Sequence, residues 1–150
     1  MNHLATSKED ILAASRDLIK ENGWAAVSIR AVASRCSVSA GTIYNYYESK
    51  ADLLSDTIES IWHEIFFHPE DEQVFHDVES CISWIYERLE YGNRQFPGFF
   101  SLHSFGFMRD EKTSGKKRMM KTWGHILNGL CEVLGNDPKV RADVFDQEFT

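Results

Sequence analysis

The sequence has few of the features that mark secreted, membrane or zinc-binding proteins. Its three cysteines, Cys36, Cys81 and Cys131, are far apart and form no CxxC pair, which argues against a disulfide framework and a zinc site. The longest apolar runs, such as residues 65–67, fall far short of the roughly 20 residues of a membrane-spanning helix. The first residues lack the basic and apolar regions of a secretory signal. We therefore expect a cytoplasmic protein with no membrane contact.

Positive charge is also scarce, but it is unevenly distributed. The net charge of the whole chain is -7. Residues 1–50 contain six Lys and Arg and five Asp and Glu, which gives +1. Residues 51–150 contain ten Lys and Arg and eighteen Asp and Glu, which gives -8. Phosphate contacts act within about a Debye length, roughly 8–10 Å, so a DNA-binding surface needs only local positive charge. The charge pattern therefore allows nucleic-acid contacts in the first fifty residues and disfavours them in the acidic remainder.

Capping residues and apolar periodicity predict four helices in the first half of the chain. Each one starts at a Ser or Thr that can accept a hydrogen bond from the backbone three residues later, and the first one should close at Asn22-Gly23. The predicted segments are 7–22, 28–36, 39–47 and 49–69.

The second half also shows helical periodicity. Apolar residues from Val74 to Leu89 form a stripe that stops at 91–93, and a long helix is predicted from Glu111 to Leu134, closing at 135–136. Residues 96–108 are dense in phenylalanine and predict a short buried helix or two turns of one. No segment shows sustained strand-like alternation, so the predicted fold class is all-α.

The second and third predicted helices are joined by Ser37 and Val38 alone. Such a short connection forces the two helices to cross steeply around a shared apolar plug, as in a helix-turn-helix unit. Val38, Ile43 and Tyr47 are the predicted plug and core residues of this unit.

The third helix carries the residue types that dock on DNA. Its start offers unpaired backbone N–H groups, small residues and hydroxyls suited to phosphates, and Thr42 and Asn45 can hydrogen-bond base edges. Tyr44 and Tyr46 add long arms that end in a hydroxyl, while Lys50 can pair with a phosphate. The candidate DNA-binding residues are Ser28, Ser39, Ala40, Gly41, Thr42, Tyr44, Asn45, Tyr46 and Lys50.

These residues carry a family resemblance. Residues 38–54, VSAGTIYNYYESKADLL, resemble the recognition block of the TetR family of transcriptional regulators. Residues 11–33 resemble the family's first two helices in order and spacing, and the match covers about residues 7–66. Tyr47 stands where the family usually has phenylalanine, and Tyr46 where histidine or tyrosine is common.

The resemblance implies an architecture and a mechanism. It divides the chain into a DNA-binding domain, 1–49, and a helical effector-binding and dimerisation domain, 50–150, joined through a long helix at about 50–67. Members are homodimers that place two recognition helices in successive major grooves of a near-palindromic operator. A small hydrophobic effector in the second domain changes the head spacing and releases the DNA. We therefore expect a ligand-responsive repressor, with activation as the lesser alternative.

The alternative within the same scaffold is an architectural or cell-division type of DNA-binding protein that is controlled by a protein partner. Family bodies usually continue through two more long helices, whereas this sequence stops at Thr150. We expect either a truncated chain or dimerisation through other helices, such as residues 111–134.

Aromatic residues of the second half offer a candidate effector cavity, which the resemblance implies. The same residues are equally compatible with an ordinary helical core, and both interpretations stay open at this stage. They are Trp62, Phe66, Trp84, Tyr86, Phe100, Phe105 and Trp123.

No motif indicates an enzyme. The sequence contains no nucleophile elbow, phosphate loop or dinucleotide fingerprint, and its six histidines lack metal-ligand spacing. The basic cluster at 116–118 with Lys121 is typical of a solvated helix face. We expect no catalysis, no cofactor and no metal.

Overall fold

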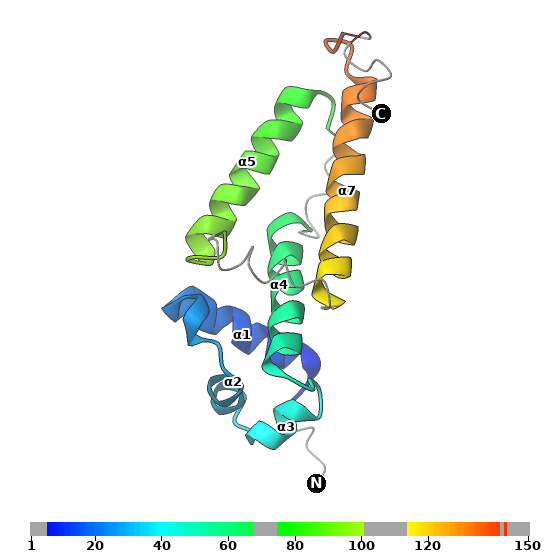
Figure 1. Ribbon diagram of the computed structural model, residues 1–150. Helices are drawn as coiled ribbons and strands as arrows, with labels where there is room; N and C mark the ends of the chain where they lie inside the picture. The colour runs from blue at the N-terminus through cyan, green and yellow to red at the C-terminus, as the bar shows by residue number, and fades with distance from the viewer. Residues whose placement is uncertain (1–5, 68–74, 101–113, 142, 144–150) are drawn as a thin grey trace.

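The computed structural model describes residues 6–67, 75–100, 114–141 and 143, and these residues form helices and turns without a strand. The predicted all-α fold class is confirmed. α1 to α3 gather at one end, α5 and α7 lie at the other, and α4 runs between them (Figure 1). The elements are α1 (Lys8–Asn22), a short 3-10 turn η1 (Trp24–Ala26), α2 (Ile29–Arg35), α3 (Ala40–Tyr44), α4 (Lys50–Phe66), α5 (Val78–Gln95) and α7 (Ser114–Asn136).

The first four helices begin at the serines that the sequence predicts. The Ser7 hydroxyl accepts a hydrogen bond from the Asp10 amide at 3.1 Å, and the Asp10 carboxylate accepts one from the Ser7 amide at 3.1 Å, which completes a capping box. The hydroxyls of Ser28, Ser39 and Ser49 accept from the backbone amide three residues later. These local bonds fix where each helix starts and therefore position the turns between them.

The turn between α2 and α3 stores backbone strain at Ser37. Its φ of 56° lies in the left-handed region, which a residue with a Cβ enters at a cost of roughly 1–2 kcal/mol. The Val38 amide donates to the Ala33 carbonyl at 2.9 Å and the Ser37 amide to the Ser34 carbonyl at 3.1 Å, the paired bonds of a Schellman motif. This motif ends α2 and turns the chain sharply into α3.

One hydrophobic core connects α1 to α3 with the helices at the other end of the molecule. Ile11, Val32, Ile43 and Leu53 are fully buried, and the cluster they belong to continues along α4 to Phe99. Tyr47 is buried as predicted, and Val38 packs against the cluster while remaining half-buried. The α4 helix therefore belongs to both ends of the molecule, so that the predicted boundary at residues 49 and 50 does not divide the core.

A polar cluster joins α1, α4 and α5. The Glu64 carboxylate of α4 pairs with Lys20 at 2.8 Å and with Arg16 at 3.4 Å, both on α1. The Tyr91 hydroxyl of α5 donates to the same carboxylate at 3.2 Å. Burial and then the adjacent Glu64 charge raise the pKa of Tyr91, so this phenol stays protonated and keeps donating.

The end of α4 is held by an arginine from α5. The Arg88 guanidinium donates to the main-chain carbonyls of Glu64 and Ile65 and lies over the Tyr91 ring, 4.6 Å from its centroid. Carbonyls of a helix's last turn have no partner within the helix, so Arg88 satisfies two groups that α4 itself leaves open.

Four predicted helix limits differ from the structure. α5 begins only at Val78, after the Asp77 cap, and passes through 91–93 to Gln95. A Cβ at Gly92 would lie 2.6 Å from the Ile65 Cδ1 atom, so this glycine permits close contact between α5 and α4 and does not end the helix. α7 likewise includes residues 135–136, and the third helix ends at Tyr44 instead of continuing to 46 or 47.

The phenylalanine-rich segment is partly described. Residues 97–100 form a turn in which Phe99 is fully buried, as is the preceding Phe96. The rest of the helix predicted at 96–108 lies outside the described residues, as does most of 142–150.

Replacing Ser37 by glycine is expected to stabilise the protein. Glycine removes the Cβ strain at positive φ, and its greater freedom in the unfolded chain offsets part of this gain, which leaves a net increase of about 0.5–1 kcal/mol in the free energy of unfolding. Urea denaturation measures the change. Ser34→Gly, three residues earlier within α2, should instead lower the free energy of unfolding by about 0.5 kcal/mol. Equal destabilisation by both variants would contradict the strain assigned to Ser37.

Candidate nucleic-acid interface

The α3 helix and the turn after it present side chains to solvent at the tip of the molecule (Figure 1). The Tyr44 side chain is 52% exposed and that of Tyr46 is 39% exposed, although both are large and mostly apolar. Ser39, Gly41, Asn45 and Lys50 are exposed, while Ser28, Ala40 and Thr42 are partly so. All nine residues predicted to contact DNA therefore have surface that a partner could reach, whereas Ile43 between them is fully buried.

The hydroxyls at the start of α3 are already engaged with one another. The Ser39 Oγ accepts from the Thr42 amide at 3.2 Å and lies 3.1 Å from the Thr42 Oγ1. Because only one proton can bridge two hydroxyls, the other hydroxyl keeps its proton for an outside acceptor. The pair thus holds both side chains in position and leaves one donor for a phosphate or a base edge.

The two exposed tyrosines have different roles. The Tyr46 hydroxyl donates to the Thr6 carbonyl at 2.8 Å and so ties the turn after α3 to the residues that lead into α1. The Tyr44 hydroxyl forms no hydrogen bond with any described residue. Of the two, Tyr44 is therefore the side chain whose hydroxyl is available to an outside acceptor, whereas Tyr46 fixes the end of α3.

Most cations of this region are neutralised within the protein. Lys8 pairs with Asp56 at 2.9 Å, and Arg35 donates to Glu21 at 2.7 Å. The hydrogen bond from Arg35 lowers the pKa of the Glu21 carboxyl, so that pair stays charged. With Arg16 and Lys20 on Glu64, four of the six cations in residues 1–50 are paired.

The two remaining cations, Arg30 and Lys50, are exposed and form no ion pair with a described residue. Arg30 lies on α2 and Lys50 is the first residue of α4, and both helices adjoin α3. Sequence reasoning missed Arg30. Its place in the sequence could have indicated it. The neighbouring residues 29 and 31–33 have apolar side chains that turn inward, and Arg30 is left on the outer face of α2. These two cations, beside the exposed acid Glu48, are therefore the ones in this region that remain available to an outside anion.

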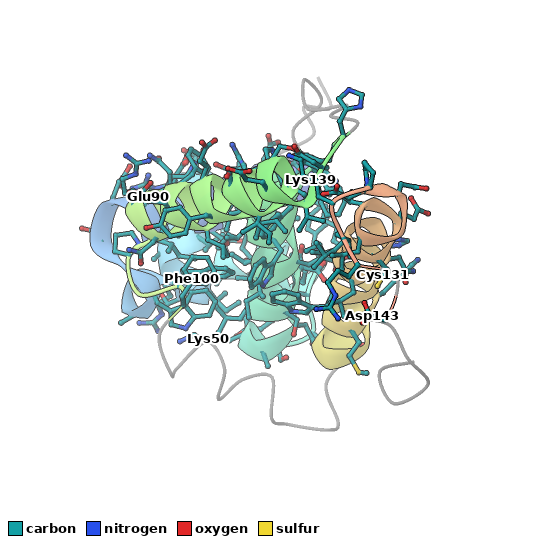
Figure 2. All side chains as sticks on the ribbon, turned by 90° about the horizontal axis from the view of Figure 1, so that it is seen from above. Lys50, Glu90, Phe100, Cys131, Lys139 and Asp143 are labelled. Atoms are coloured by element: carbon teal, nitrogen blue, oxygen red, sulfur yellow. The ribbon has the colours of Figure 1, made fainter. Side chains whose placement is uncertain are left out.

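The body contains a second candidate site. A cavity of about 430 Å³ opens between the end of α4, α5 and α7. These three helices contact one another, and Figure 2 shows them from above with their side chains. The cavity is lined by Phe66, Phe67, Phe75, Cys81, Trp84, Ile85, His125, Ile126, Gly129, Leu130, Glu132, Val133 and Asn136.

The predicted aromatic residues divide between this cavity and the core. Phe66 and Trp84 line the cavity. Trp62 is buried and packs against Phe100 and Trp123, with ring centroids 5.6 Å and 5.0 Å away, so these three rings serve the core. Tyr86 is 68% exposed and does not line the cavity. Phe105 lies outside the described residues.

The N-terminal part of the chain is similar to known proteins. Residues 11–57, from α1 into the first half of α4, match the family model of bacterial regulatory proteins of the tetR family. The N-terminal part of this chain is thus similar to the tetR family. The resemblance of the sequence to this family is confirmed for these residues.

The matched segment is also similar to individual regulators. It is 38% identical over 48 residues to the HTH-type transcriptional regulator UidR of Escherichia coli K12, which covers 32% of this chain and 24% of UidR. It is 45% identical over 47 residues to the HTH-type transcriptional repressor KstR of Rhodococcus jostii, which covers 31% of this chain and 22% of KstR. The matched segment thus spans about a quarter of the length of these relatives. No helix in the described part of the chain is long and apolar enough to cross a membrane.

Removing the hydroxyls of the two exposed tyrosines should have different effects on stability. Tyr46→Phe lacks the bond to Thr6 and should lower the free energy of unfolding by about 1 kcal/mol. Tyr44→Phe should leave stability within about 0.5 kcal/mol of the parent protein, because its hydroxyl has no partner among the described residues. Urea denaturation of both variants makes the comparison. Equal stability of Tyr46→Phe and the parent would show that the Thr6 bond contributes nothing to the fold.

Proposed function

We propose that this protein is a sequence-specific DNA-binding transcriptional regulator. The observation that carries the proposal is the surface around α3, where Tyr44, Thr42 and the unpaired cations Arg30 and Lys50 surround a helix that follows a sharp turn. The tetR-family match over the same segment supports it, as do the names of UidR, a regulator, and KstR, a repressor. Phosphate contacts from the cations would set the position on the duplex, and contacts from α3 would read bases.

The protein acts as a homodimer in this proposal. A single five-residue α3 can contact only a few base pairs, whereas two copies related by a two-fold axis read a near-palindromic operator. The body helices support pairing, because Ile82 and Tyr86 of α5 and Met120 and Leu127 of α7 are all more than half exposed. A second copy that covers these large apolar side chains removes them from water, and this burial stabilises the dimer.

The activity is repression that a small molecule relieves. α4 begins with Lys50 at the interface and ends with Phe66 at the cavity, so one rigid helix reaches both sites. A ligand that binds the cavity more tightly in one orientation of α4 would shift the population towards that orientation. The difference in its affinity for the two states sets how far DNA affinity falls. The cavity thus favours control by a small molecule over control by a protein partner.

Selection from a random-sequence duplex pool at moderate salt tests the DNA-binding activity. The parent protein is expected to enrich a two-fold palindrome, and a Thr42→Ala, Tyr44→Ala double variant should lose the enrichment because it lacks the base-reading side chains. Circular dichroism confirms that the variant is folded. A folded dimer that enriches no sequence would overturn the proposal.

The two unpaired cations should carry the salt dependence of binding. Arg30→Gln and Lys50→Gln should each weaken binding to all sequences and reduce the slope of log affinity against log salt by about one for each phosphate that the variant no longer neutralises. Arg35→Gln is the matched control, since Arg35 is already paired with Glu21 and should leave the slope unchanged. Affinity titrations over a range of salt concentrations measure all three slopes. An equal reduction of the slope in Arg35→Gln would contradict the roles assigned to Arg30 and Lys50.

A further inference from the structure

The cavity in the body has an aromatic wall. The Trp84 ring lies 5.8 Å from the Phe66 ring in an edge-on contact and 5.3 Å from the Phe75 ring at a tilted angle, measured between centroids. All three rings line the cavity, together with Phe67, which is partly exposed. They come from the end of α4, the start of α5 and the segment before α5, so the wall is made of rings that converge from different elements.

The opposite wall carries the polar groups. His125, Glu132 and Asn136 of α7 line the cavity, and no Lys or Arg of the described residues does so. Burial raises the pKa of the Cys81 thiol, which is therefore neutral. Glu132 is thus the one acidic side chain among the described lining residues, and no lysine or arginine of that lining opposes it.

This combination selects the charge of a ligand. Aromatic rings present electron-rich faces that attract organic cations, and a nearby carboxylate adds to that attraction. Residues 51–150 carry a net charge of -8, which draws cations towards the body and repels anions. The volume of about 430 Å³ is within the ~300–1,000 Å³ typical of pockets for drug-sized molecules.

We propose that the cavity between α4, α5 and α7 binds a lipophilic organic cation, with its apolar groups against Phe66, Phe75 and Trp84 and its charge towards Glu132. The inference rests on the proposed function in one respect, since it names the chemical class of the effector. A ligand in this place touches Phe66, the last residue of α4, next to the carbonyls that Arg88 holds. Its binding therefore acts directly on the helix that leads to the DNA-facing surface.

Two probes of the same shape and opposite charge test the proposal. Tetraphenylphosphonium and tetraphenylborate are titrated into the full chain by isothermal titration calorimetry. The phosphonium is expected to bind at least about tenfold more tightly than the borate. Equal binding of the two ions, tighter binding of the borate, or binding of neither would overturn the proposal.

Variants locate the site. Glu132→Gln should lower phosphonium affinity about fivefold or more, and Trp84→Leu should lower it as well, because each removes one of the two features that attract a cation. Glu79→Gln is the matched control, since Glu79 is an exposed acid of α5 that does not line the cavity. Circular dichroism establishes that each variant is folded. Equal effects of Glu132→Gln and Glu79→Gln would show a general charge effect and contradict the site.

A second measurement separates this inference from the proposed function. The phosphonium is added to the complex of the protein with its selected operator, and DNA binding is followed by fluorescence anisotropy. Release of DNA supports both proposals. Phosphonium binding that depends on Glu132 but releases no DNA supports the cavity ligand and contradicts effector control. Selective operator binding by a protein that shows no preference for the phosphonium supports the regulator and overturns the cavity ligand.

Discussion

The arrangement of the two ends of this protein depends on the contacts that Glu64 makes. This carboxylate is only 23% exposed, so it has lost much of its hydration and needs donors within the protein. Lys20 and Arg16 supply them from α1 and Tyr91 from α5. If the carboxylate were removed, the partly buried Lys20 would lose its ion-pair partner, which costs more than the pair itself contributes. Arg16 would keep only its contacts with the exposed Glu9 and with Ser60. The cluster therefore fixes the orientation of α1 relative to α5 through one side chain of α4.

The geometry of α4 follows from that constraint. Its first turn adjoins α3, its middle is buried in the core through Ile58 and Ile61, and its last carbonyls are held by Arg88. A helix packed in this way moves as a rigid unit, because its interior contacts are close and its ends are both satisfied. In the proposed mechanism, a small displacement at Phe66 would be transmitted along α4 to Lys50, which would connect the cavity with the surface around α3 in mechanical terms.

The sequence predicted the features that depend on neighbouring residues. The four serine caps and the short connection at 37–38 are encoded within a few positions, and the structure confirms them. Features that depend on contacts between residues far apart in the sequence were either not predicted or predicted wrongly. Gly92 has the local pattern of a helix end, and only its contact with Ile65 shows why it lies within α5. The bond between Tyr46 and Thr6 joins residues 40 positions apart, so no local pattern indicates it. The division of the aromatic residues between core and cavity is likewise set by how α5 and α7 pack on α4.

The contact between Tyr46 and Thr6 has a practical consequence for handling the protein. It brings the start of the described chain, at Thr6, to within one hydrogen bond of the turn that follows α3. Any affinity tag or fluorescent fusion attached at the N-terminus is therefore anchored beside the surface proposed to face DNA. Such a fusion would compete for that surface through its bulk and charge. A sequence appended after α7 avoids that surface, because the end of α7 and α3 lie at opposite ends of the molecule in Figure 1.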